Sequence, residues 1–473
     1  MTQHPSDGEQ PPPYDLGVDR LAREPESDGA RAAATSEPGA VRAGAAPEAS
    51  VDLGRRTFFR TFGRESLQAA GAMVGVANAL RSGATTATSE LLGLGLDDPA
   101  ARRLEPPAPE RPTSAGQDAV PYRSPYRLAD GVLRIVDQRQ LPHRLVELEC
   151  RTAGEVAGAL RAGVLPGGPV LGQVAAYGLA LTGWRTRDEP YHVRRAVLRA
   201  GGAALKKARP ASRAVSVTVD RLLERWSSLG ETAPGGEGAQ LLRGEADMVA
   251  TAASYEHARL GRTGADLLTV PADRPLELLI HGSVGALGGG LVGTAMAVVQ
   301  AAVTEGRSVH LFLTVGSVDA HGGLLAWESA KAGVAHTLVA EGALGWLLAE
   351  RPVDAVLLGA EWIAANGDTA AATGSFPIAV LAARMAVPVY VCTPLLAIAD
   401  KTPNGAAIPR EMREAGARLT AAEAAQDPAA AVESLLPAVD VTSGECITGF
   451  VTAEGLLVAP YAESLAAATG SAA

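Results

Sequence analysis

Cysteine and aromatic residues are scarce in this sequence. The chain of 473 residues has three cysteines, Cys150, Cys392 and Cys446, and aromatic side chains make up only 4% of it. The cysteines are far apart and form no CxxC pair, so the sequence indicates neither a disulfide framework nor a cysteine-based zinc site. Unpaired cysteines fit the reducing conditions of the cytoplasm, where we expect the protein to be located.

Excess basic charge and long apolar runs are also lacking. The formal net charge is −10 at pH 7, whereas general nucleic-acid binding needs a basic face, so we expect no nucleic-acid partner. No apolar run approaches the roughly 20 residues that span a bilayer. The chain is long enough for two or three domains with a sizeable core.

Residues 1–120 predict a disordered tail and a linker. Large apolar side chains are rare at the start of the tail, so burial could not offset the entropy lost on ordering. Residues 54–83 differ, because apolar side chains recur there at helical spacing beside arginines, which predicts a basic amphipathic helix. We expect this helix, Arg55–Leu80, to dock on the protein's own core, on a partner protein or on a membrane surface. Its start, Arg55–Phe59, also resembles a twin-arginine export signal, although it lies far from Met1.

The sequence of residues 121–261 predicts a small, mainly helical domain that opens with a β-hairpin. Apolar and polar residues alternate over Tyr126–Gln138 around Asp130-Gly131, which is a strong hairpin signal. After a further strand-like stretch, apolar residues recur at helical spacing through the rest of this domain.

Residues 262–465 alternate strands and helices, which predicts a Rossmann-like domain with a mostly parallel sheet. The expected strands are Leu276–Ile280, Val309–Thr314, Ala335–Val339, Ala355–Leu358 and Val387–Cys392. Residues 445–460 predict a last strand or hairpin and a closing segment. The predicted fold class is therefore α/β, with a helical domain preceding a Rossmann-like domain.

The most informative stretch of the sequence is Leu276–Asp368, which contains two expected strands that each end in a turn. A short apolar strand ends at His281 and is followed by a glycine-rich turn that contains Gly285. Such a turn suits a phosphate on the free N–H groups of the next helix, or close packing alone, and the pattern does not choose between them. A second strand ends just before Glu361. Ligands bind beyond the carboxyl ends of parallel strands, so both turns should face one crevice.

Six motifs, taken in order, resemble those of the methylthioribose-1-phosphate isomerase family. That superfamily also holds ribose-1,5-bisphosphate isomerases and the alpha, beta and delta subunits of translation initiation factor 2B. The likeness covers about Tyr126 to Val458. The matching segments are Val136–Pro142 (family LDQxxLP), Gly167–Gly172 (RGAPAIG), Arg209-Pro210 with Asp220-Arg221 (RPTAVNLxxALDRM), His281–Leu287 (HCNAGAL), Ala326–Glu328 (AWE) and Gly359–Asp368 (GADRIAANGD).

The resemblance implies a helical domain on a Rossmann-like domain, usually in a dimer. It also implies an enzyme that converts an aldose 1-phosphate to a ketose with a cysteine and an aspartate. Here Gly282 stands at the cysteine position and Glu361 at the aspartate position, so the thiol is absent and the carboxylate reaches one methylene further. Only Arg209 remains among the phosphate-binding cations that the family leads us to expect. The other positions hold Pro166, Gly316, Ala371 and Ala372.

The motif matches give one catalytic candidate and several candidate ligand contacts. Glu361 is the expected acid/base group. The expected substrate contacts are Arg209, Ser283, Gly285, Asn366 and Asp368. Asn366 and Asp368 also suit the bracing of their own turn, while His321 with Asp319 fits a remodelled site. We expect no cofactor and no metal, because ligand-type spacing is missing.

Three functions from different classes stay open. The first is an isomerase-family enzyme acting on a phosphorylated or altered pentose, with Glu361 as the acid/base group. The second is a non-catalytic ligand-binding or regulatory protein, similar to the initiation-factor subunits. The third is a scaffold that the basic helix Arg55–Leu80 recruits to a partner or a membrane surface. A small phosphorylated sugar or a related ligand is the expected small-molecule partner, and a homodimer is the expected assembly.

Overall fold

The computed structural model describes residues 124–269, 271, 273–316, 318–413 and 435–470. The predicted disordered tail and linker, with the basic helix at residues 54–83, lie outside the described residues. The fold-class prediction can therefore be compared with the structure only for the two folded domains.

The helical domain opens with the predicted β-hairpin. Strands β1 (Tyr126–Ala129) and β2 (Val132–Val136) pair antiparallel, and Ala129 lies opposite Val132. Asp130 and Gly131 form the two-residue loop and both have positive φ angles, 54° and 70°, as a type I′ turn requires. Strand β3 (Glu147–Cys150) pairs with β2 and completes a three-stranded sheet. The hairpin prediction is thus confirmed.

Five helices follow this sheet, and α4 lies at their centre. Helix α4 is apolar around its whole circumference, so it is stable only where other helices cover every face. Its side chains belong to one buried cluster with residues of the neighbouring helices. The helices are α3 (Ala153–Arg161), α4 (Val170–Arg185), α5 (Tyr191–Ala208), α6 (Arg213–Ser227) and α7 (Gly235–Leu267).

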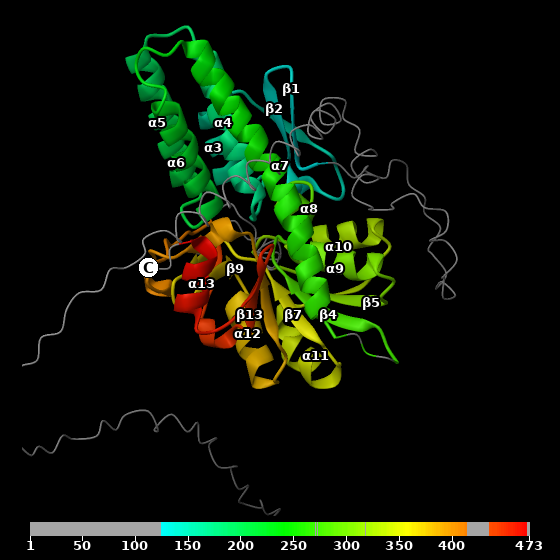
Figure 1. Cartoon of the computed structure of the whole chain (residues 1–473). Coiled ribbons are helices and arrows are strands. Elements are labelled where there is room, and N and C mark those ends of the chain that lie inside the picture. The colour runs from blue at the N-terminus through cyan, green and yellow to red at the C-terminus, as the bar shows by residue number, and fades with distance from the viewer. Residues whose placement is uncertain (1–123, 270, 272, 317, 414–434, 471–473) are drawn as a thin grey trace, which may run out of the picture. The chain divides into compact units, whose positions relative to one another are not determined.

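Helix α7 runs from the helical part of the fold to the side of the main sheet, where it packs on α9 (Ala295–Thr304) and β13 (Gly449–Thr452) (Figure 1). It runs beyond Gly261, where the sequence suggested that the helical pattern ends. Gly261 and Gly264 do not stop the helix, because they are contact points: the side chain of Val298 and the backbone of Ala297 lie directly against them. The two glycines therefore allow close approach between helices.

The second domain is built on a seven-stranded sheet in the order β14-β13-β10-β7-β4-β5-β6. All neighbouring pairs are parallel except β13 and β14, so the predicted, mostly parallel sheet is confirmed. The strands are β4 (Leu276–His281), β5 (Val309–Thr314), β6 (Ala335–Val339), β7 (Ala355–Leu358), β10 (Val389–Cys392), β13 (Gly449–Thr452) and β14 (Gly455–Leu457). The five predicted strands agree with β4, β5, β6, β7 and β10 within two residues at each end.

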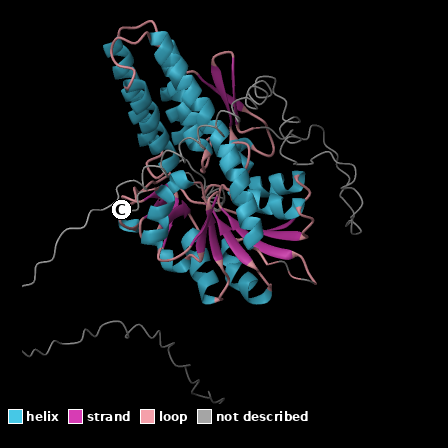
Figure 2. Cartoon of the chain, viewed as in Figure 1, coloured by secondary structure: helices cyan, strands magenta, loops and turns pink. Residues whose placement is uncertain are grey.

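Helices cover both faces of this sheet (Figure 2). On one face, side chains of α7, α9 and α10 form a buried cluster with the strands, and on the other face α11, α12 and α13 do so. Because both faces are covered, the central strands are almost wholly apolar. The remaining helices are α8 (Ala286–Gly289), α10 (His321–Lys331), α11 (Leu344–Glu350), α12 (Ser375–Arg384) and α13 (Tyr461–Thr469).

A second, small sheet was not predicted. It has the order β11-β8-β9-β12 and lies outside the main sheet. Its strands are β8 (Trp362–Ala364), β9 (Thr369–Ala372), β11 (Ile398–Ala399) and β12 (Val439–Thr442). The strands are two to four residues long, so each carries too little periodicity to be recognised in the sequence.

The chain changes direction across the main sheet between β4 and β7. From β4 it proceeds through β5 to β6 on one side, and from β7 through β10 to β13 on the other. The carboxyl ends of β4 and β7 are therefore a topological switch point, which is where open α/β sheets bind ligands. The turn after His281 and the loop before Glu361 both begin there.

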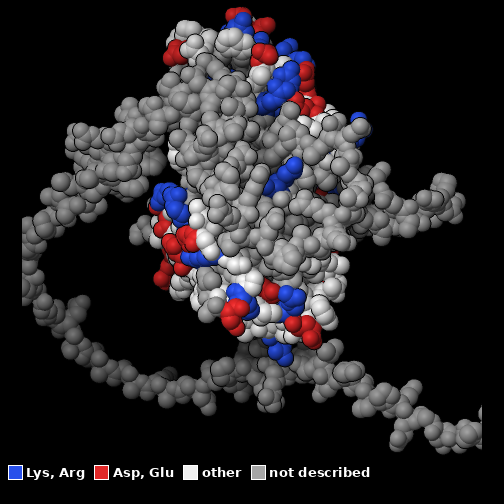
Figure 3. Space-filling view, turned by 90° about the vertical axis from the view of Figure 1, so that its right-hand side faces the viewer, with Lys and Arg blue, Asp and Glu red and all other residues white. Residues whose placement is uncertain are grey.

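Two surface properties bear on the class of partner. No helix among the described residues is both long enough and apolar enough to cross a membrane. On the face drawn in Figure 3, the visible basic and acidic side chains lie among one another. The described part of that face therefore shows no continuous basic stripe that would follow a nucleic-acid backbone.

The glycines of α7 make a direct test of its packing. A Cβ atom on Gly261 would lie 2.6 Å from the backbone oxygen of Ala297, whereas one on Gly244 in the same helix would meet nothing within 4 Å. We expect Gly261→Ala to lower the free energy of unfolding by about 1–3 kcal/mol because of overpacking. We expect the matched control Gly244→Ala to raise it by up to about 1 kcal/mol, through helix propensity. Urea unfolding measures both, and equal stability of the two variants would contradict this packing.

Candidate functional site

A cavity lies at the switch point between β4 and β7. Its walls come from the loop before α4, the turns after β4 and β7, the loop before α10 and the small sheet. Its enclosed volume is about 30 Å³, which is space for about two water molecules. The lining residues are Pro166, Gly167, Gly168, Pro169, Arg209, Gly282, Ser283, Val284, Thr294, Asp319, Gly359, Ala360, Glu361, Ala371, Ala372, Cys392, Pro394, Ala438 and Val439.

The cavity brings together some of the predicted site residues. Glu361, Arg209 and Ser283 line it, so the expectation that the two turns face one crevice is confirmed. The lining does not include Gly285, Asn366 or Asp368. Of the other positions where the family motifs led us to expect phosphate contacts, Pro166, Ala371 and Ala372 line the cavity, and Gly316 is not among the lining residues.

Glu361 follows β7 and is half-buried. Its carboxyl oxygen Oε1 accepts a hydrogen bond of 2.5 Å from the backbone N–H of Gly168, in the loop before α4. Burial raises the pKa of this carboxyl, while the nearby Arg209 opposes the shift. A raised pKa moves a carboxyl in the direction that suits an acid/base group.

Arg209 lies at the end of α5 and is almost wholly buried, with 3% of its side chain exposed. Its Nη1 and Nη2 atoms donate to the backbone carbonyls of Leu165 and Pro166, at 3.0 and 2.9 Å. Its Nε atom lies 2.7 Å from Oε1 of Glu411. Burial lowers the pKa of the guanidinium. Arg209 thus holds the loop before α4 in place, and its nitrogens already have partners.

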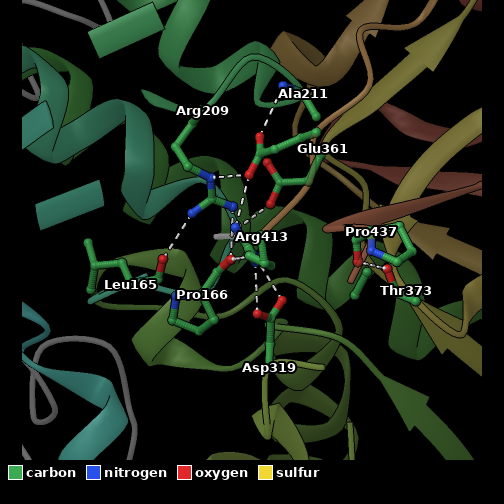
Figure 4. Close-up of polar contacts among 12 residues, drawn as sticks. Leu165, Pro166, Arg209, Ala211, Asp319, Glu361, Thr373, Arg413 and Pro437 are labelled. Atoms are coloured by element: carbon green, nitrogen blue, oxygen red, sulfur yellow. Dashed lines mark hydrogen bonds and ion pairs between the residues drawn. The ribbon is translucent and has the colours of Figure 1, made fainter. Parts of the chain in front are cut away.

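A second guanidinium, that of Arg413, lies beside the first and was not predicted (Figure 4). Its Nε and Nη2 atoms donate to the two carboxyl oxygens of Asp319, at 3.0 and 2.8 Å. Nη1 donates to Glu411 at 2.9 Å, and Nη2 also donates to the carbonyl of Pro166 at 2.7 Å. Glu411 therefore bridges the two guanidinium groups, and Asp319 pairs with the second.

The charges around the cavity are balanced by internal partners. Two guanidinium groups, those of Arg209 and Arg413, face three carboxyls, those of Glu361, Glu411 and Asp319. The cluster is neutral when Glu361 is protonated and carries one negative charge when it is ionised. No uncompensated positive charge is left in this cluster to attract an anion.

The glycine-rich turn, where a ligand contact at Gly285 was expected, has hydrogen-bond partners within the protein. The carboxyl of Glu328, on α10, accepts a 2.7 Å hydrogen bond from the N–H of Leu287 at the start of α8. A side chain on Gly285 would overlap that carboxyl. Buried Gln138 and Gln173 donate to carbonyls of the same turn. The turn therefore serves close packing, and a protein carboxyl occupies the position that the sequence left open for phosphate.

Asn366 and Asp368 brace loops away from the cavity. The Asn366 side chain accepts from the N–H of Asp368 at 3.1 Å. The two oxygens of Asp368 accept from the N–H groups of Gly405 and Gly444, at 2.9 and 3.1 Å. Although burial acts to raise the pKa of Asp368, these hydrogen bonds outweigh it and lower the pKa. The structure thus places both residues where they support the fold.

Gly282 has a backbone conformation that suits glycine. Its φ angle is +102°, whereas a Cβ atom there would have ordinary contacts of 3.5 Å with Ala372 and 3.7 Å with Val284. Space for a cysteine side chain is therefore present, but the backbone angle is one that side-chain-bearing residues rarely adopt. The Ser283 hydroxyl next to it has no hydrogen-bond partner among the described residues and can donate to a ligand.

Two buried histidine rings, those of His281 and His321, contact each other near the cavity. The rings of His281 and His321 are 4.6 Å apart and meet edge to face. His281 contacts the Thr314 hydroxyl at 2.7 Å and the carbonyl of Ala372 at 3.2 Å, while His321 packs on Gly316. Burial lowers the pKa of both rings. His281 thus joins the end of β5 to the end of β9.

The described residues contain no set of side chains placed to bind a metal ion. Across residues 124–470, with the gaps named above, no group of three or more His, Cys, Asp or Glu side chains is placed to hold an ion. The functional side chains that line the cavity are those of Glu361, Asp319, Arg209, Ser283, Thr294 and Cys392.

Sequence reasoning missed Glu411 and Arg413. They belong to the segment Ile408–Arg413, where charged residues directly follow Ile408-Pro409. This run was the available signal. It could not be assigned to the site, because the contact with Arg209 joins segments that are far apart in the sequence.

Glu328 makes the stability of the protein depend on pH. Burial raises its pKa from 4.5 to about 7, so folding favours the protonated form. Its contribution to stability is present below pH 4.5 and is lost as the pH rises to about 7, by about 3 kcal/mol in all. We expect Glu328→Gln to gain stability relative to the wild type over this range, as measured by thermal unfolding at several pH values. The exposed Glu350→Gln is the control, and a pH-independent difference for Glu328→Gln would contradict the assignment.

Comparison with known proteins places the chain in a family. A model of the initiation factor 2 subunit family matches residues 167–459. Methylthioribose-1-phosphate isomerase of Magnetococcus marinus is 34% identical over 342 residues, which cover 72% of this chain and 96% of that protein. The isomerase of Anaeromyxobacter sp. (strain Fw109-5) is 36% identical over 337 residues, which cover 71% and 94%.

Solved structures agree with these matches. The 5-methylthioribose 1-phosphate isomerase from Pyrococcus horikoshii OT3 has a TM-score of 0.62 at 26% identity, covering 73% of this chain and 96% of that one. Subunit delta of translation initiation factor eIF-2B from A. fulgidus has a TM-score of 0.58 at 25% identity, covering 73% and 99%. The resemblance that the motifs indicated is confirmed. The chain belongs to the initiation factor 2 subunit family, together with the methylthioribose-1-phosphate isomerases that it resembles.

Proposed function

We propose that the chain is a remodelled member of the aldose–ketose isomerase lineage, with Glu361 as its acid/base group. The observation that supports this most directly is the position of Glu361: it lines a cavity at the switch point of the sheet, half-buried and with a raised pKa. Isomerisation moves hydrogen between C1 and C2 of a sugar, and a carboxyl beside O2 can carry or polarise that hydrogen.

The remaining lining limits what this reaction can use. Gly282 supplies no thiol, so Glu361 would act without the partner that the family motif provides. The Ser283 hydroxyl can orient a sugar oxygen. Because the extra methylene of glutamate shifts the carboxyl by about 1 Å, we expect slower turnover of methylthioribose 1-phosphate than the family motif would give, by about 100-fold or more.

Phosphorus and proton NMR of methylthioribose 1-phosphate and of unphosphorylated methylthioribose tests the proposal. We expect the purified protein to convert at least one of the two to its ketose, slowly, and Glu361→Gln to abolish conversion because the amide cannot exchange a proton. The control is Glu463→Gln, an exposed glutamate on α13 that lies outside the cavity lining.

Absence of conversion at high protein concentration, with both sugars, would contradict an enzymatic role. Conversion that Glu361→Gln retains in full would contradict the assignment of the acid/base group. These two outcomes separate the reaction from the residue that performs it.

A non-catalytic ligand-binding or regulatory role is the second candidate. The glycine at position 282 and the internally paired arginines favour it, because both remove groups that a phosphosugar isomerase would use. A sugar that raises the melting temperature without being converted would support this role over the enzymatic one.

Two other expectations remain proposals. We propose a cytoplasmic homodimer, for which the three free cysteines and the family resemblance are the support. A protein or membrane-surface partner for Arg55–Leu80 also stays a prediction, since that segment lies outside the described residues. Deletion of residues 1–115, followed by analysis of oligomeric state and location, tests whether this arm recruits the protein.

A further inference from the structure

Asp319, which lines the cavity, forms a bidentate ion pair with Arg413, which is not itself among the lining residues. Both carboxyl oxygens of Asp319 accept from the guanidinium, and the two side chains are only 15% and 8% exposed. Paired, nearly parallel hydrogen bonds of this kind are among the strongest polar contacts in proteins. Asp319 comes from the loop before α10 and Arg413 from a segment that follows the small sheet's β11, so the pair also ties two walls together.

Among the described residues, the two guanidinium groups near this pair already have internal partners. The other donors of Arg413 reach Glu411 and the carbonyl of Pro166, and those of Arg209 reach Glu411 and two carbonyls. A phosphate could reach a guanidinium only by displacing a carboxylate. It would then lie beside that displaced charge and beside Glu361, and like charges brought together oppose binding.

The same lining suits an uncharged sugar. Asp319 and Glu361 present carboxyl oxygens at the cavity, which accept hydrogen bonds from hydroxyl groups. Ser283 adds a hydroxyl that can donate to a sugar oxygen. Alanine, glycine and proline make up most of the remaining wall.

We propose that Asp319 determines the specificity of this cavity: by neutralising Arg413 it excludes a phosphate group and selects an unphosphorylated polyhydroxy aldehyde. This inference rests on the proposed function insofar as it takes the ligand to be a sugar. The phosphate exclusion itself depends on the internal pairing of Arg413 and Arg209 by Asp319 and Glu411 and not on catalysis by Glu361.

Removing the charge of Asp319 tests the exclusion of phosphate, because the proposal predicts that the variant binds phosphate more tightly. Asp319→Asn keeps the size of the side chain and removes its charge, so Arg413 becomes available to an anion. With inorganic phosphate as the probe, at constant ionic strength, we expect the variant to bind about tenfold tighter than the wild type or better, by calorimetry and by melting-temperature shift. The double variant Asp319→Asn/Arg413→Gln should lose that gain.

Asp354 provides a matched control. Asp354 forms the same kind of bidentate ion pair with Arg274, whose Nη1 and Nη2 atoms lie 2.8 and 2.6 Å from the carboxyl oxygens. Neither residue lines the cavity. Asp354→Asn should leave phosphate binding at the wild-type level. Asp319→Ala, which frees Arg413 in the same way, supplies the measurement if Asp319→Asn does not fold.

The outcomes separate this inference from the proposed function. A folded Asp319 variant with no gain in phosphate binding would overturn it, as would wild-type protein that binds inorganic phosphate as tightly as the variant. A wild type that gains more thermal stability from methylthioribose 1-phosphate than from methylthioribose would also overturn it. None of these results depends on whether Glu361 catalyses a conversion.

Discussion

The ion-pair network of Arg209, Glu411, Arg413 and Asp319 is the interaction on which the site depends. It joins the end of α5, the loop before α4, the loop before α10 and the segment after β11. Buried charges are costly unless they are paired, and here each guanidinium has at least one carboxylate within ion-pair distance. The network therefore fixes the walls of the cavity and its charge at the same time.

Internal carboxylates occupy the places where an anionic ligand would otherwise bind. Glu328 accepts the N–H group at the glycine-rich turn, and Glu411 and Asp319 accept from the two arginines. The scaffold is that of the family, since the sheet order, the switch point and the motif positions are all present. The charge balance around the ligand position is particular to this chain, and the net charge there is close to zero.

Features with local signals could be predicted from the sequence. The hairpin at Asp130-Gly131 and the strands of the main sheet were recognised because turn chemistry and apolar runs act over a few residues. The position of Glu361 at the cavity followed from the rule that ligands lie beyond the strand ends. Glu328 and Arg413 could not be placed, because their contacts join distant segments. The packing role of Gly261 and Gly285 was hidden for a similar reason, since a glycine does not reveal what lies against it.

Calorimetric titration of the wild-type protein with methylthioribose 1-phosphate tests the central claim, which is that the described arginines at the cavity are paired internally and are not free to bind a phosphate group. The account predicts a dissociation constant of about 1 mM or weaker, with no gain at low ionic strength. A dissociation constant near about 1 μM, weakening steeply as salt is added, would contradict it. That result would mean that a phosphate displaces the internal carboxylates and that the arginines act as a binding site.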